Sequence, residues 1–512
     1  MKLNKILLIL IFLLGLTLRF AKLEQLPAIL NRDEAALAYN ALLIRETGQD
    51  EWQVSAPLVF KSFGDYKLPS YPYLLAFLFN FLPSNDFVVR LPSALAGSLL
   101  IVLAFFFARD VLKLKVRSSL LLALFVALNP VFFFYSRIAF EANLALLLFV
   151  ASLFFLLKSK NNYYLAAFLL FLATLTYNTP LLLLPFILPI IIFQHGLKNY
   201  KTWLLPVLLF VAIFLFGAFN FASLASQKSG ITIFNDQTLW QDFATYRTSL
   251  PENYRMILGN KYLFYAKEIG RNFLDSFSLN FLVENGGSHP WHSLPATGHL
   301  FYLLYFLAIF MLIDLLGEFL IKPADKKMRS RHFICFYLLL IALAPSVVTV
   351  DSPHATRSLF FFFMLLSLAA MFIDRLSTVF LKHSRTIFTL IILGLALESA
   401  FYYKKYFLDY PQQQPSSLFV EYRDLLFEAE QKYSDQKIAV IDEGGYQYIL
   451  TAWYLQLPSS DFFSTMKYQA ADQINFYYGE RLLHYHFIKN LADLGSEERI
   501  VIDQKLGLVK YE

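Results

Sequence analysis

Apolar and polar positions fall into long alternating blocks along most of this chain. Runs of about 18 apolar residues recur, and a helix of that length comes close to crossing the hydrocarbon core of a bilayer. Short segments that carry Lys, Arg, Pro or Asn separate these runs. The pattern predicts eleven membrane-spanning helices, at residues 1–20, 91–108, 118–134, 142–157, 163–178, 181–194, 203–220, 299–320, 333–350, 358–374 and 386–402.

The first apolar run has the features of a membrane anchor. It follows Lys2 and Lys5, a basic start that secretory signals and first spanning helices share. No small-residue cleavage site follows the run, and Arg19 and Lys22 lie where one would be expected. We therefore expect the N-terminus to be cytoplasmic and the chain from about residue 21 to emerge on the outer face.

Residues 70–82 are apolar but too few to span a bilayer, and Pro83 closes them. They predict an interfacial helix on the outer face. With this assignment, basic residues gather in the loops placed inside, while the short loops placed outside hold only Arg137 and Arg357. Counting residues 70–82 as a span would invert every later loop and violate the positive-inside rule. The inside loops are those at residues 109–117, 158–160, 198–201, 322–331 and 375–385.

Composition agrees with this fold class, an α-helical polytopic membrane protein. Apolar residues make up 57% of the 512 residues and charged residues only 16%, against about a quarter in soluble domains. The formal net charge of +6 is explained by the inside loops, so no nucleic-acid partner is expected. The single cysteine, Cys335, cannot form an internal disulfide and says nothing about the redox compartment.

Three long segments face outward in this topology, at residues 21–90, 221–298 and 403–512. The last has the composition of a soluble domain. Residues 437–442 (KIAVID) and 499–503 (RIVID) predict strands, and residues 446–455 between them predict a helix. The sequence therefore predicts a transmembrane domain at residues 1–402 and a small extracytoplasmic α/β domain at residues 403–512.

An acidic pair, Asp33 and Glu34, is the clearest candidate for chemistry. One interpretation is structural: Asn31 or Asp33 caps the helix predicted at residues 35–46, whose positive N-terminus favours acids. The other is catalytic, because a carboxylate at a partly dry surface can take a proton from an incoming hydroxyl. Position in the sequence leaves both interpretations open.

Three basic residues lie in the same outer loop as the acidic pair: Lys61, Lys67 and Arg90. Lys67 comes just before the predicted interfacial helix, where Pro69 and Pro72 stiffen the chain. A cation at the depth of the lipid head groups is a natural partner for a lipid phosphate. Ordinary extension of a long basic side chain toward the membrane surface is the alternative.

At this point the chain resembles a known family. The motifs that carry the resemblance are NRDEAALAYNALLIRETGQ, GDYKLPSYPYLL and VVRLPSALAGSLLIVLAFFFARDVL, with YSRIAFEANLALLLF, GGSHPWHSLPATGHLFYL and DSPHATRSL further on. Together they are similar to the GT-C glycosyltransferases of family 39 type, which include protein O-mannosyltransferases and lipid A aminoarabinose transferases. The likeness extends over roughly residues 5–400 in architecture, and the motifs are specific as a set rather than singly.

The resemblance implies a membrane enzyme that uses a sugar linked to a polyprenyl phosphate. Such enzymes transfer a hexosyl or pentosyl unit, with inversion, to a hydroxyl on the extracytoplasmic face of, here, a bacterial cytoplasmic membrane. Asp33 matches the family's catalytic acid and Glu34 its supporting partner. Lys67 matches a lysine near the carrier phosphate. The sequence departs from the family at Leu68, where proline is common, and at Tyr66, where some members have glutamate.

Four further residues on the predicted outer side are candidates for binding the donor phosphate: Arg137, Arg357, His292 and His354. Each has a structural alternative. Arg137 could pair with Glu141 four residues later, and His354 could cap a turn. His289 and His292 have a spacing that suits a metal, but a third ligand is missing nearby, so no dedicated zinc site is predicted. An acidic pair beside a phosphate can still recruit a divalent cation.

Two other function classes compete with the enzyme. A transporter or flippase of lipid-linked glycans would also be polytopic, but transporters often show internal repeats and polar groups at the membrane midplane, which are not visible here. A non-catalytic member whose outer domain binds a partner is the third option, and the presence of Asp33 argues against it. The sequence does not identify the sugar, or whether the acceptor is a protein, a lipid or a glycan.

Overall fold

The structure is a computed structural model that describes residues 2–63, 65–158, 162–195, 200–221, 232–287, 289, 291–321, 326–414, 418–472 and 476–511. They form two compact units. The helical unit comprises Met1–Ala21, Ala94–Ser136 and Ala142–Asp409. The mixed unit comprises Lys22–Ser93, Arg137–Glu141 and Tyr410–Glu512.

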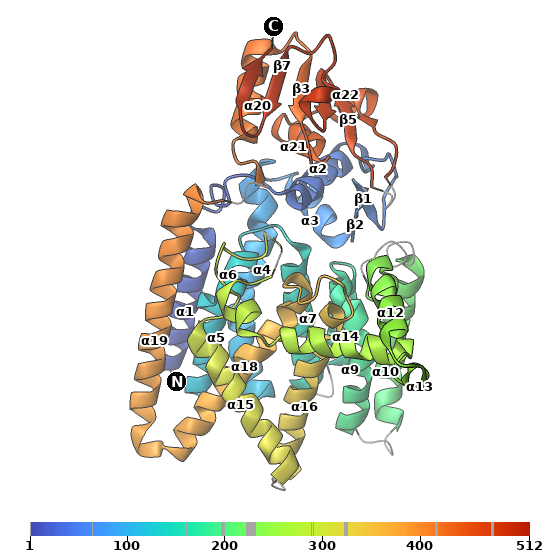
Figure 1. Cartoon of the computed structure of the whole chain (residues 1–512). Helices are drawn as coiled ribbons and strands as arrows, with labels where there is room; N and C mark the ends of the chain where they lie inside the picture. The colour runs from blue at the N-terminus through green and yellow to red at the C-terminus, as the bar shows by residue number, and fades with distance from the viewer. Residues whose placement is uncertain are drawn as a thin grey trace. The chain divides into compact units, whose positions relative to one another are not determined.

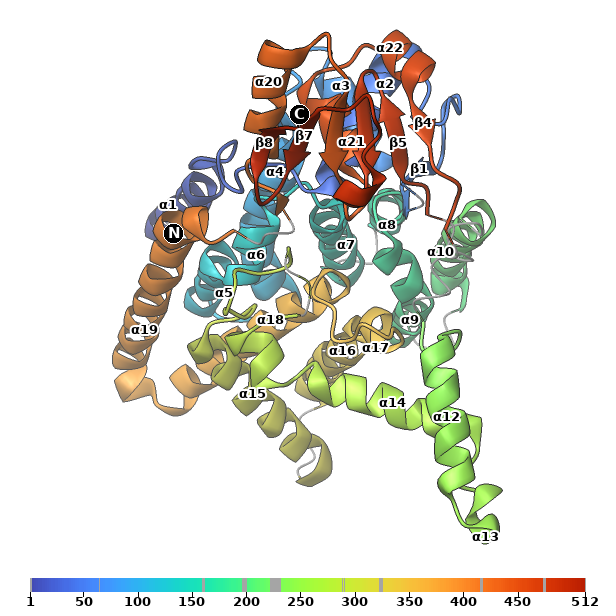
Figure 2. The ribbon, with the colours of Figure 1, turned by 45° about the horizontal axis from the view of Figure 1, so that its top comes forward.

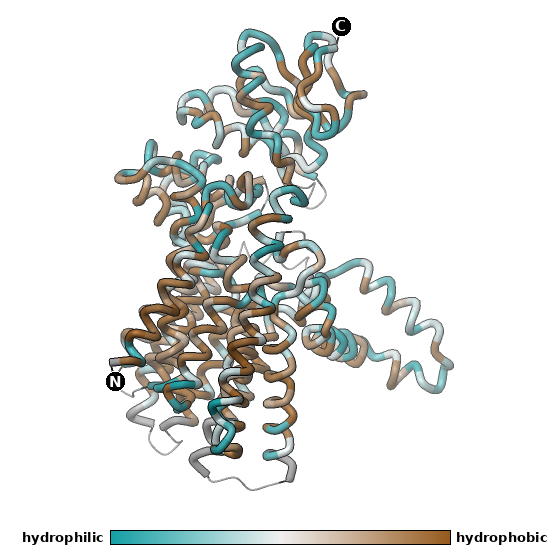
Figure 3. The backbone as a smooth tube through the Cα atoms, turned by 90° about the vertical axis from the view of Figure 1, so that its left-hand side faces the viewer, coloured by the Kyte–Doolittle hydropathy of each residue, from teal (hydrophilic) through white to brown (hydrophobic). Residues whose placement is uncertain are grey.

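Helices cover most of every stretch that was predicted to span the membrane (Figure 1). Most of their residues carry the hydrophobic colour in Figure 3. In the part of the chain that the structure describes, six helices are long and apolar enough to cross a membrane, and four shorter apolar helices accompany them. The chain is thus a multi-pass membrane protein, while the count of eleven spans stays a prediction. The helices are α1 (Lys2–Phe20), α4 (Asp86–Phe106), α5 (Val116–Leu128), α6 (Pro130–Tyr135), α7 (Glu141–Lys158), α8 (Tyr163–Thr174), α9 (Asn178–His195), α10 (Tyr200–Asn220), α15 (Tyr302–Ile321), α16 (Lys326–Ala342), α17 (Ala344–Val347), α18 (Leu359–Val379) and α19 (Ser384–Lys404).

The core of the helical unit is built around α18. This helix packs against α15, α5, α16 and α19. Every side chain at residues 359–371 is buried, including four consecutive phenylalanines. A helix that is apolar on all sides has to be covered on all sides, and this explains its central position. The predicted outer loop between α10 and α15 adds α12 (Gln237–Ser249), α13 (Glu252–Arg255) and α14 (Lys261–Asp275).

A break between α5 and α6 creates a site for Arg19. Pro130 lacks an amide hydrogen and disfavours helical geometry at Asn129, so α5 ends at the preceding residue. The last carbonyls of a helix lack intrahelical donors. The fully buried Arg19 guanidinium donates to two of them, Val126 O at 2.9 Å and Ala127 O at 3.0 Å. The C-terminal end of α1 is therefore anchored to the C-terminal end of α5.

The mixed unit contains the predicted α/β segment (Figure 2). Its sheet has the strand order β4-β5-β6-β3-β7-β8, and the central strand β3 runs parallel to β6 and β7. The predicted strands are confirmed as β3 and β7, and the predicted helix as α21. The strands are β3 (Ile438–Ile441), β4 (Lys467–Tyr468), β5 (Gly479–Leu482), β6 (Tyr485–Ile488), β7 (Ile500–Asp503) and β8 (Gly507–Lys510), and the helices are α20 (Tyr422–Tyr433), α21 (Gln447–Tyr454) and α22 (Ser459–Thr465).

The segment predicted to be the first outer loop belongs to the same compact unit. It forms α2 (Arg32–Thr47), a hairpin of β1 (Phe60–Ser62) and β2 (Asp65–Lys67), and α3 (Ser70–Leu78). The helix predicted at residues 70–82 is therefore present, and its interfacial location stays a prediction. Helix α2 packs against both α3 and α21. Residues 22–93 and 410–512 thus belong to one compact unit, although the predicted division at residues 402/403 assigns them to different domains.

A buried carboxylate at the start of α4 connects α21 to the segment before α2. Asp86 accepts hydrogen bonds from the Trp453 indole at 2.9 Å and from the Tyr454 hydroxyl at 3.1 Å. The Tyr454 hydroxyl also accepts from the Leu30 amide at 2.9 Å. Leu30 immediately precedes Asn31, the N-cap of the helix that carries the acidic pair. The C-terminal segment therefore helps to position the backbone just before Asp33.

A second buried carboxyl group in this unit, Glu51, gives the protein a pH-dependent stability. Glu51 is 3% exposed, and burial raises its pKa from 4.5 to about 8, although the hydrogen bond from the Trp52 indole acts in the opposite direction. The folded protein therefore holds a proton that the unfolded chain releases above pH 4.5. The stabilisation is complete below that pH and is lost as the pH rises through about 8.

We expect the melting temperature of the wild-type protein to fall between pH 5 and pH 8, by the equivalent of roughly 1 kcal/mol per pH unit. Glu51→Gln, which keeps the shape of the protonated acid, should flatten this dependence, as measured by differential scanning fluorimetry in detergent. Glu24→Gln, at an exposed position of the same unit, is the control and should retain the wild-type slope. An unchanged slope in Glu51→Gln would contradict the assignment.

Candidate active site

The N-terminus of α2 is closed by a capping box. The Asn31 side chain accepts from the amides of Asp33 at 2.9 Å and Glu34 at 3.1 Å, and the Glu34 carboxylate accepts from the Asn31 amide at 3.0 Å. Of the two residues proposed as caps from the sequence, Asn31 has this role. Capping by Asn31 and Glu34 leaves the Asp33 side chain available for another contact.

Asp33 is paired with Lys67. The Lys67 ammonium donates to Asp33 Oδ1 at 2.8 Å and to Asp65 Oδ2 at 2.7 Å. Lys67 ends β2, and the β1–β2 hairpin brings it to the helix N-terminus although it is 34 residues away in the sequence. The Lys67 side chain is 10% exposed and that of Asp33 is 21% exposed, so both can be reached from solvent. Within the described residues, Asp33 Oδ2 has no hydrogen bond.

The electrostatic surroundings of Lys67 are acidic. Burial alone would lower the Lys67 pKa, but the carboxylates of Asp33, Asp65 and Glu141 raise it well above its ordinary value. The amine is therefore an ammonium ion at every physiological pH. Lys67 is the cation that these three carboxylates share, so a bound donor phosphate would have to compete with them for its ammonium.

Glu34 is fully engaged in holding the structure together. Its side chain is 1% exposed, and it accepts from Arg90 Nε at 3.1 Å and from the Ala139 amide at 2.8 Å, besides its two bonds with Asn31. Arg90 is completely buried and also donates to the carbonyls of Leu23, Pro27 and Ile29. This geometry suits a positioning role for Glu34. Both of its carboxylate oxygens accept hydrogen bonds from the protein, so neither is free for the catalytic role predicted from the sequence.

Arg137 and Glu141 lie in the short segment that completes this unit. Arg137 is completely buried and donates from one terminal nitrogen to the carbonyls of Lys22 at 3.0 Å and Leu26 at 3.1 Å. The contact of Arg137 with a donor phosphate stays a prediction. The observed arrangement does not support it, because the guanidinium is buried and bonded to backbone carbonyls. Glu141, the first residue of α7, was not singled out from the sequence. In the sequence, Glu141 is an acid in the motif YSRIAFEANLALLLF, and it entered the predictions only as the residue that could pair with Arg137.

Three other predicted site residues come together in the helical unit. The imidazole rings of His292 and His354 lie 4.7 Å apart. The Thr356 hydroxyl lies 3.1 Å from His292 Nε2 and 2.8 Å from the Tyr135 hydroxyl. Arg357, in the turn after His354, donates to the Asp351 carboxylate at 2.5 Å. The structure thus groups His292, His354 and Arg357 as one polar cluster.

Burial keeps both histidines of this cluster neutral. It lowers the pKa of His292 well below 6.5, and the neighbouring His354 acts in the same direction. Burial also lowers the pKa of His354 to about 3, with Arg357 as the next cause. The guanidinium of Arg357 is therefore the cation that this cluster can offer to an anion, while the imidazoles can serve as neutral hydrogen-bond partners.

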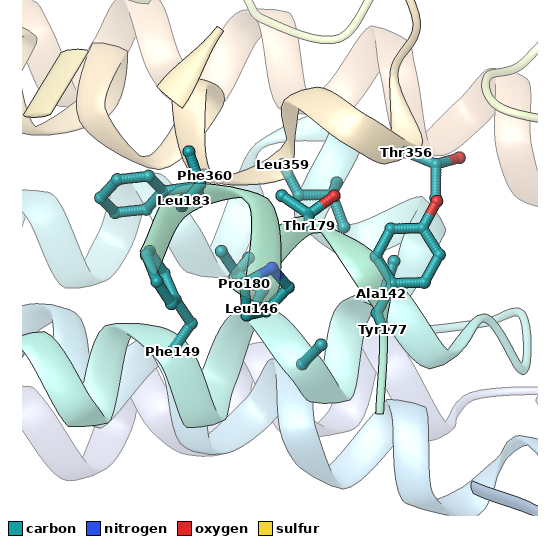
Figure 4. A pocket seen from close by; sticks show the side chains of 11 residues that line it. Ala142, Leu146, Phe149, Tyr177, Thr179, Pro180, Leu183, Thr356, Leu359 and Phe360 are labelled. Atoms are coloured by element: carbon teal, nitrogen blue, oxygen red, sulfur yellow. The ribbon is translucent and has the colours of Figure 1, made fainter. Parts of the chain in front are cut away.

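An apolar pocket adjoins this cluster at Thr356 (Figure 4). In Figure 4, Thr356 and Tyr177 lie at one end of it and Phe149 and Phe360 at the other. The pocket has a volume of about 20 Å³, enough for about one water molecule. A polyprenyl tail does not fit into it as the helices are packed here. The groove for the carrier tail between apolar helices stays a prediction.

The predicted option of a divalent cation finds little support in the acidic group. Among the described residues, no group of three or more His, Cys, Asp or Glu side chains has a geometry that could hold a metal. The Lys67 ammonium donates to both Asp33 and Asp65 and therefore lies between these two carboxylates. A divalent cation recruited by the acidic pair together with a phosphate stays a prediction.

Comparison with known proteins defines the fold. A family model described as dolichyl-phosphate-mannose-protein mannosyltransferase matches residues 67–217, less than a third of the chain. The oligosaccharyltransferase AglB from Archaeoglobus fulgidus, solved with an inhibitory peptide and a dolichol phosphate, aligns with a TM-score of 0.52 over 88% of this chain and 63% of its own, at 15% identity. The chain has the GT-C fold. The resemblance predicted from the sequence is therefore confirmed at the level of fold.

Two further solved structures share the GT-C fold. ArnT from Cupriavidus metallidurans, bound to undecaprenyl phosphate, aligns with a TM-score of 0.51 over 90% of this chain and 86% of its own, at 11% identity. The Archaeoglobus enzyme in complex with Zn and sulfate aligns with a TM-score of 0.51 over 88% of this chain and 61% of its own, at 15% identity. The chain spans less than two thirds of the archaeal enzyme. No curated protein matches it.

Proposed function

We propose that this protein transfers a glycosyl unit from a polyprenyl-phosphate carrier to an acceptor hydroxyl on the extracytoplasmic face of a bacterial cytoplasmic membrane. The main support is the Asp33–Lys67 pair, which combines a solvent-accessible carboxylate with an ammonium ion at a distance of 2.8 Å. Further support comes from the GT-C fold and from the family model over residues 67–217. The asymmetry of basic residues between loops supports a cytoplasmic N-terminus.

Asp33 acts as the general base in this proposal. Its Oδ2 takes the proton of the acceptor hydroxyl, whose oxygen forms a bond to the anomeric carbon of the donor. The bond from that carbon to the phosphate oxygen breaks, and the polyprenyl phosphate leaves with the electron pair. A single displacement of this kind inverts the anomeric configuration. Glu34, through the capping box and Arg90, holds the helix N-terminus that carries Asp33.

Lys67 stabilises the departing phosphate. An ammonium ion placed where negative charge develops lowers the barrier, because it is already oriented before reaction. A donor phosphate that takes the position of Asp33 on the Lys67 ammonium also releases the Asp33 carboxylate. Donor binding would then free the base for the acceptor. Arg357, with His292 and His354 as neutral partners, is a second candidate for contacting the donor.

The reaction can be separated from transport in one assay. Purified protein in proteoliposomes is supplied with a radiolabelled polyprenyl-phosphate sugar and an extract of cell-envelope acceptors. Label that moves from the lipid to an acceptor supports the enzyme. Label that crosses the bilayer while still attached to the intact lipid would contradict it and favour a flippase.

The role of Lys67 predicts a defect in donor use. We expect Lys67→Met to raise the apparent KM for the lipid donor by about tenfold or more, because one charge-assisted contact to phosphate is lost and the acidic neighbours stay. Initial rates over a range of donor concentrations measure this.

Lys61→Met is the matched control. Lys61 lies on the same hairpin, but its ammonium lies over the rings of Trp52 at 4.1 Å and Tyr477 at 3.7 Å. We expect Lys61→Met to leave the donor KM close to the wild-type value. An unchanged donor KM in Lys67→Met would remove the phosphate role from Lys67.

A further inference from the structure

A hollow of about 730 Å³ lies in the mixed unit, at the carboxyl ends of the parallel strands β3 and β7. Its described walls are the loop that follows β3, the turn that follows β7, Gln414 and residues 419–421. In open α/β sheets, ligands bind outside the carboxyl ends of the strands. The volume is within the usual range for a site that binds a small molecule. Both its place and its size suit a ligand.

The lining of this hollow is rich in hydrogen-bond acceptors. Glu421, Glu443 and Asp503 contribute carboxylates, and Lys505 is the one basic residue among the described lining residues. Such a surface repels phosphate and carboxylate groups. It suits a ligand that brings many hydroxyl donors and no negative charge.

The loop after β3 cannot act as an anion site. The buried Asp442 carboxylate accepts from the amides of Gly445 at 2.6 Å and Gln447 at 2.8 Å. Backbone amides at the start of a helix are otherwise a natural place for a phosphate. Here the protein's own carboxylate takes that place at the start of α21.

The buried amide of Gln447 is a second, independent indication of a ligand. Gln447 is 8% exposed and lines the hollow, and its Oε1 has no hydrogen-bond partner in the part of the chain that the structure describes. An unpaired buried oxygen is costly, so a donor is expected to satisfy it. The rings of Phe419 and Tyr446 also line the hollow. Aromatic faces beside polar acceptors provide both kinds of contact that a sugar ring offers.

The hollow is connected to the candidate base through Tyr446. The Arg32 guanidinium lies over the Tyr446 ring, 4.8 Å from its centroid. Arg32 is the first residue of α2 and directly precedes Asp33. We propose that this hollow binds an uncharged oligosaccharide, which is the acceptor whose hydroxyl is presented to Asp33. The inference rests on the proposed glycosyl transfer and narrows its acceptor to a glycan.

Binding can be tested separately from catalysis. The full-length protein in lipid nanodiscs is examined by saturation-transfer NMR with neutral oligosaccharides (maltotriose and N,N′,N″-triacetylchitotriose), glucose 6-phosphate and a Ser/Thr-rich peptide as probes. We expect saturation transfer to a neutral oligosaccharide and none to the phosphorylated sugar. Glu443→Lys should weaken binding by about tenfold or more, because an acceptor is lost and an ammonium is introduced into the hollow.

One variant serves as the control. Glu497→Lys makes the same charge change on the same unit at a residue that does not line the hollow, and its side chain is 70% exposed. It should bind like the wild-type protein. Melting temperatures of all variants exclude unfolding as the cause of lost binding.

Three outcomes would overturn the proposal. They are no saturation transfer to any neutral oligosaccharide, oligosaccharide binding that Glu443→Lys leaves unchanged, and saturation transfer to the peptide but not to the oligosaccharides. The last would indicate a protein acceptor. Failure of the proposed function has a different signature. In that case the neutral oligosaccharide binds and Glu443→Lys abolishes binding, but the wild-type protein never cleaves a polyprenyl-phosphate sugar.

Discussion

Asp33→Asn is expected to abolish glycosyl transfer while the protein stays folded. Loss of a positioned general base usually lowers the rate by about 10² to 10⁴. Asparagine keeps the size of the side chain but cannot take a proton from the acceptor hydroxyl. The fold should tolerate the change, since Asn31 and Glu34 cap α2 and the Asp33–Lys67 ion pair is partly exposed. Single-turnover rates with saturating lipid donor measure the effect.

Asp65→Asn is the matched control for this substitution. Asp65 contacts the same ammonium at 2.7 Å and is similarly exposed, at 26% against 21% for Asp33. We expect less than a tenfold loss of rate, because Asp65 supports Lys67 and accepts no proton in the proposed reaction. Retained turnover in Asp33→Asn, or equal losses in the two variants, would refute Asp33 as the base.

Glu34→Ala is expected to have the largest effect on stability. The substitution removes the partner of a completely buried guanidinium and leaves the amides of Asn31 and Ala139 without their acceptor. Breaking a buried ion pair by removing one member costs about 3 to 5 kcal/mol. We therefore expect a melting temperature many degrees below that of the wild-type protein and poor recovery from the membrane. Thermal unfolding followed by size-exclusion fluorescence measures both.

Glu46→Ala, on the last turn of the same helix, is the control. Its carboxylate is 29% exposed and paired with the neighbouring Arg45, so the expected loss is within about 1 kcal/mol. A Glu34→Ala protein that is as stable as the wild-type protein but inactive would give Glu34 a direct chemical role instead of a positioning one.

The membrane helices were predictable because their cause is local. An apolar run of sufficient length has few alternatives to a helix in a bilayer, whatever it packs against. The strands at residues 437–442 and 499–503 were predictable for the same reason, since short runs rich in Val and Ile between polar residues favour strands. Their pairing with each other, and the pairing of β3 with β6, was not predictable, because register depends on packing between distant segments.

The candidate site was predictable only in part. Family resemblance selected Asp33 and Lys67, but nothing local indicated that they form one ion pair together with Asp65. From the sequence, Arg137, His292 and Arg357 were equal candidates for binding the donor phosphate. The structure separates them by burial and partners: Arg137 binds backbone carbonyls, and Arg357 pairs with Asp351 beside the histidines.

The sequence by itself determined the membrane class and the helical and strand segments. It also marked Asp33 and Glu34 as candidates for the active site. These depend on hydrophobic runs, turn residues and short motifs, whose physical effects act within a few residues. Only the tertiary structure decided that Asn31 rather than Asp33 caps α2, that Glu34 is occupied by Arg90, and that Trp453 and Tyr454 join Asp86 across more than 360 positions. Hydrogen bonds between such distant residues form only after the chain has folded, so no local pattern encodes them.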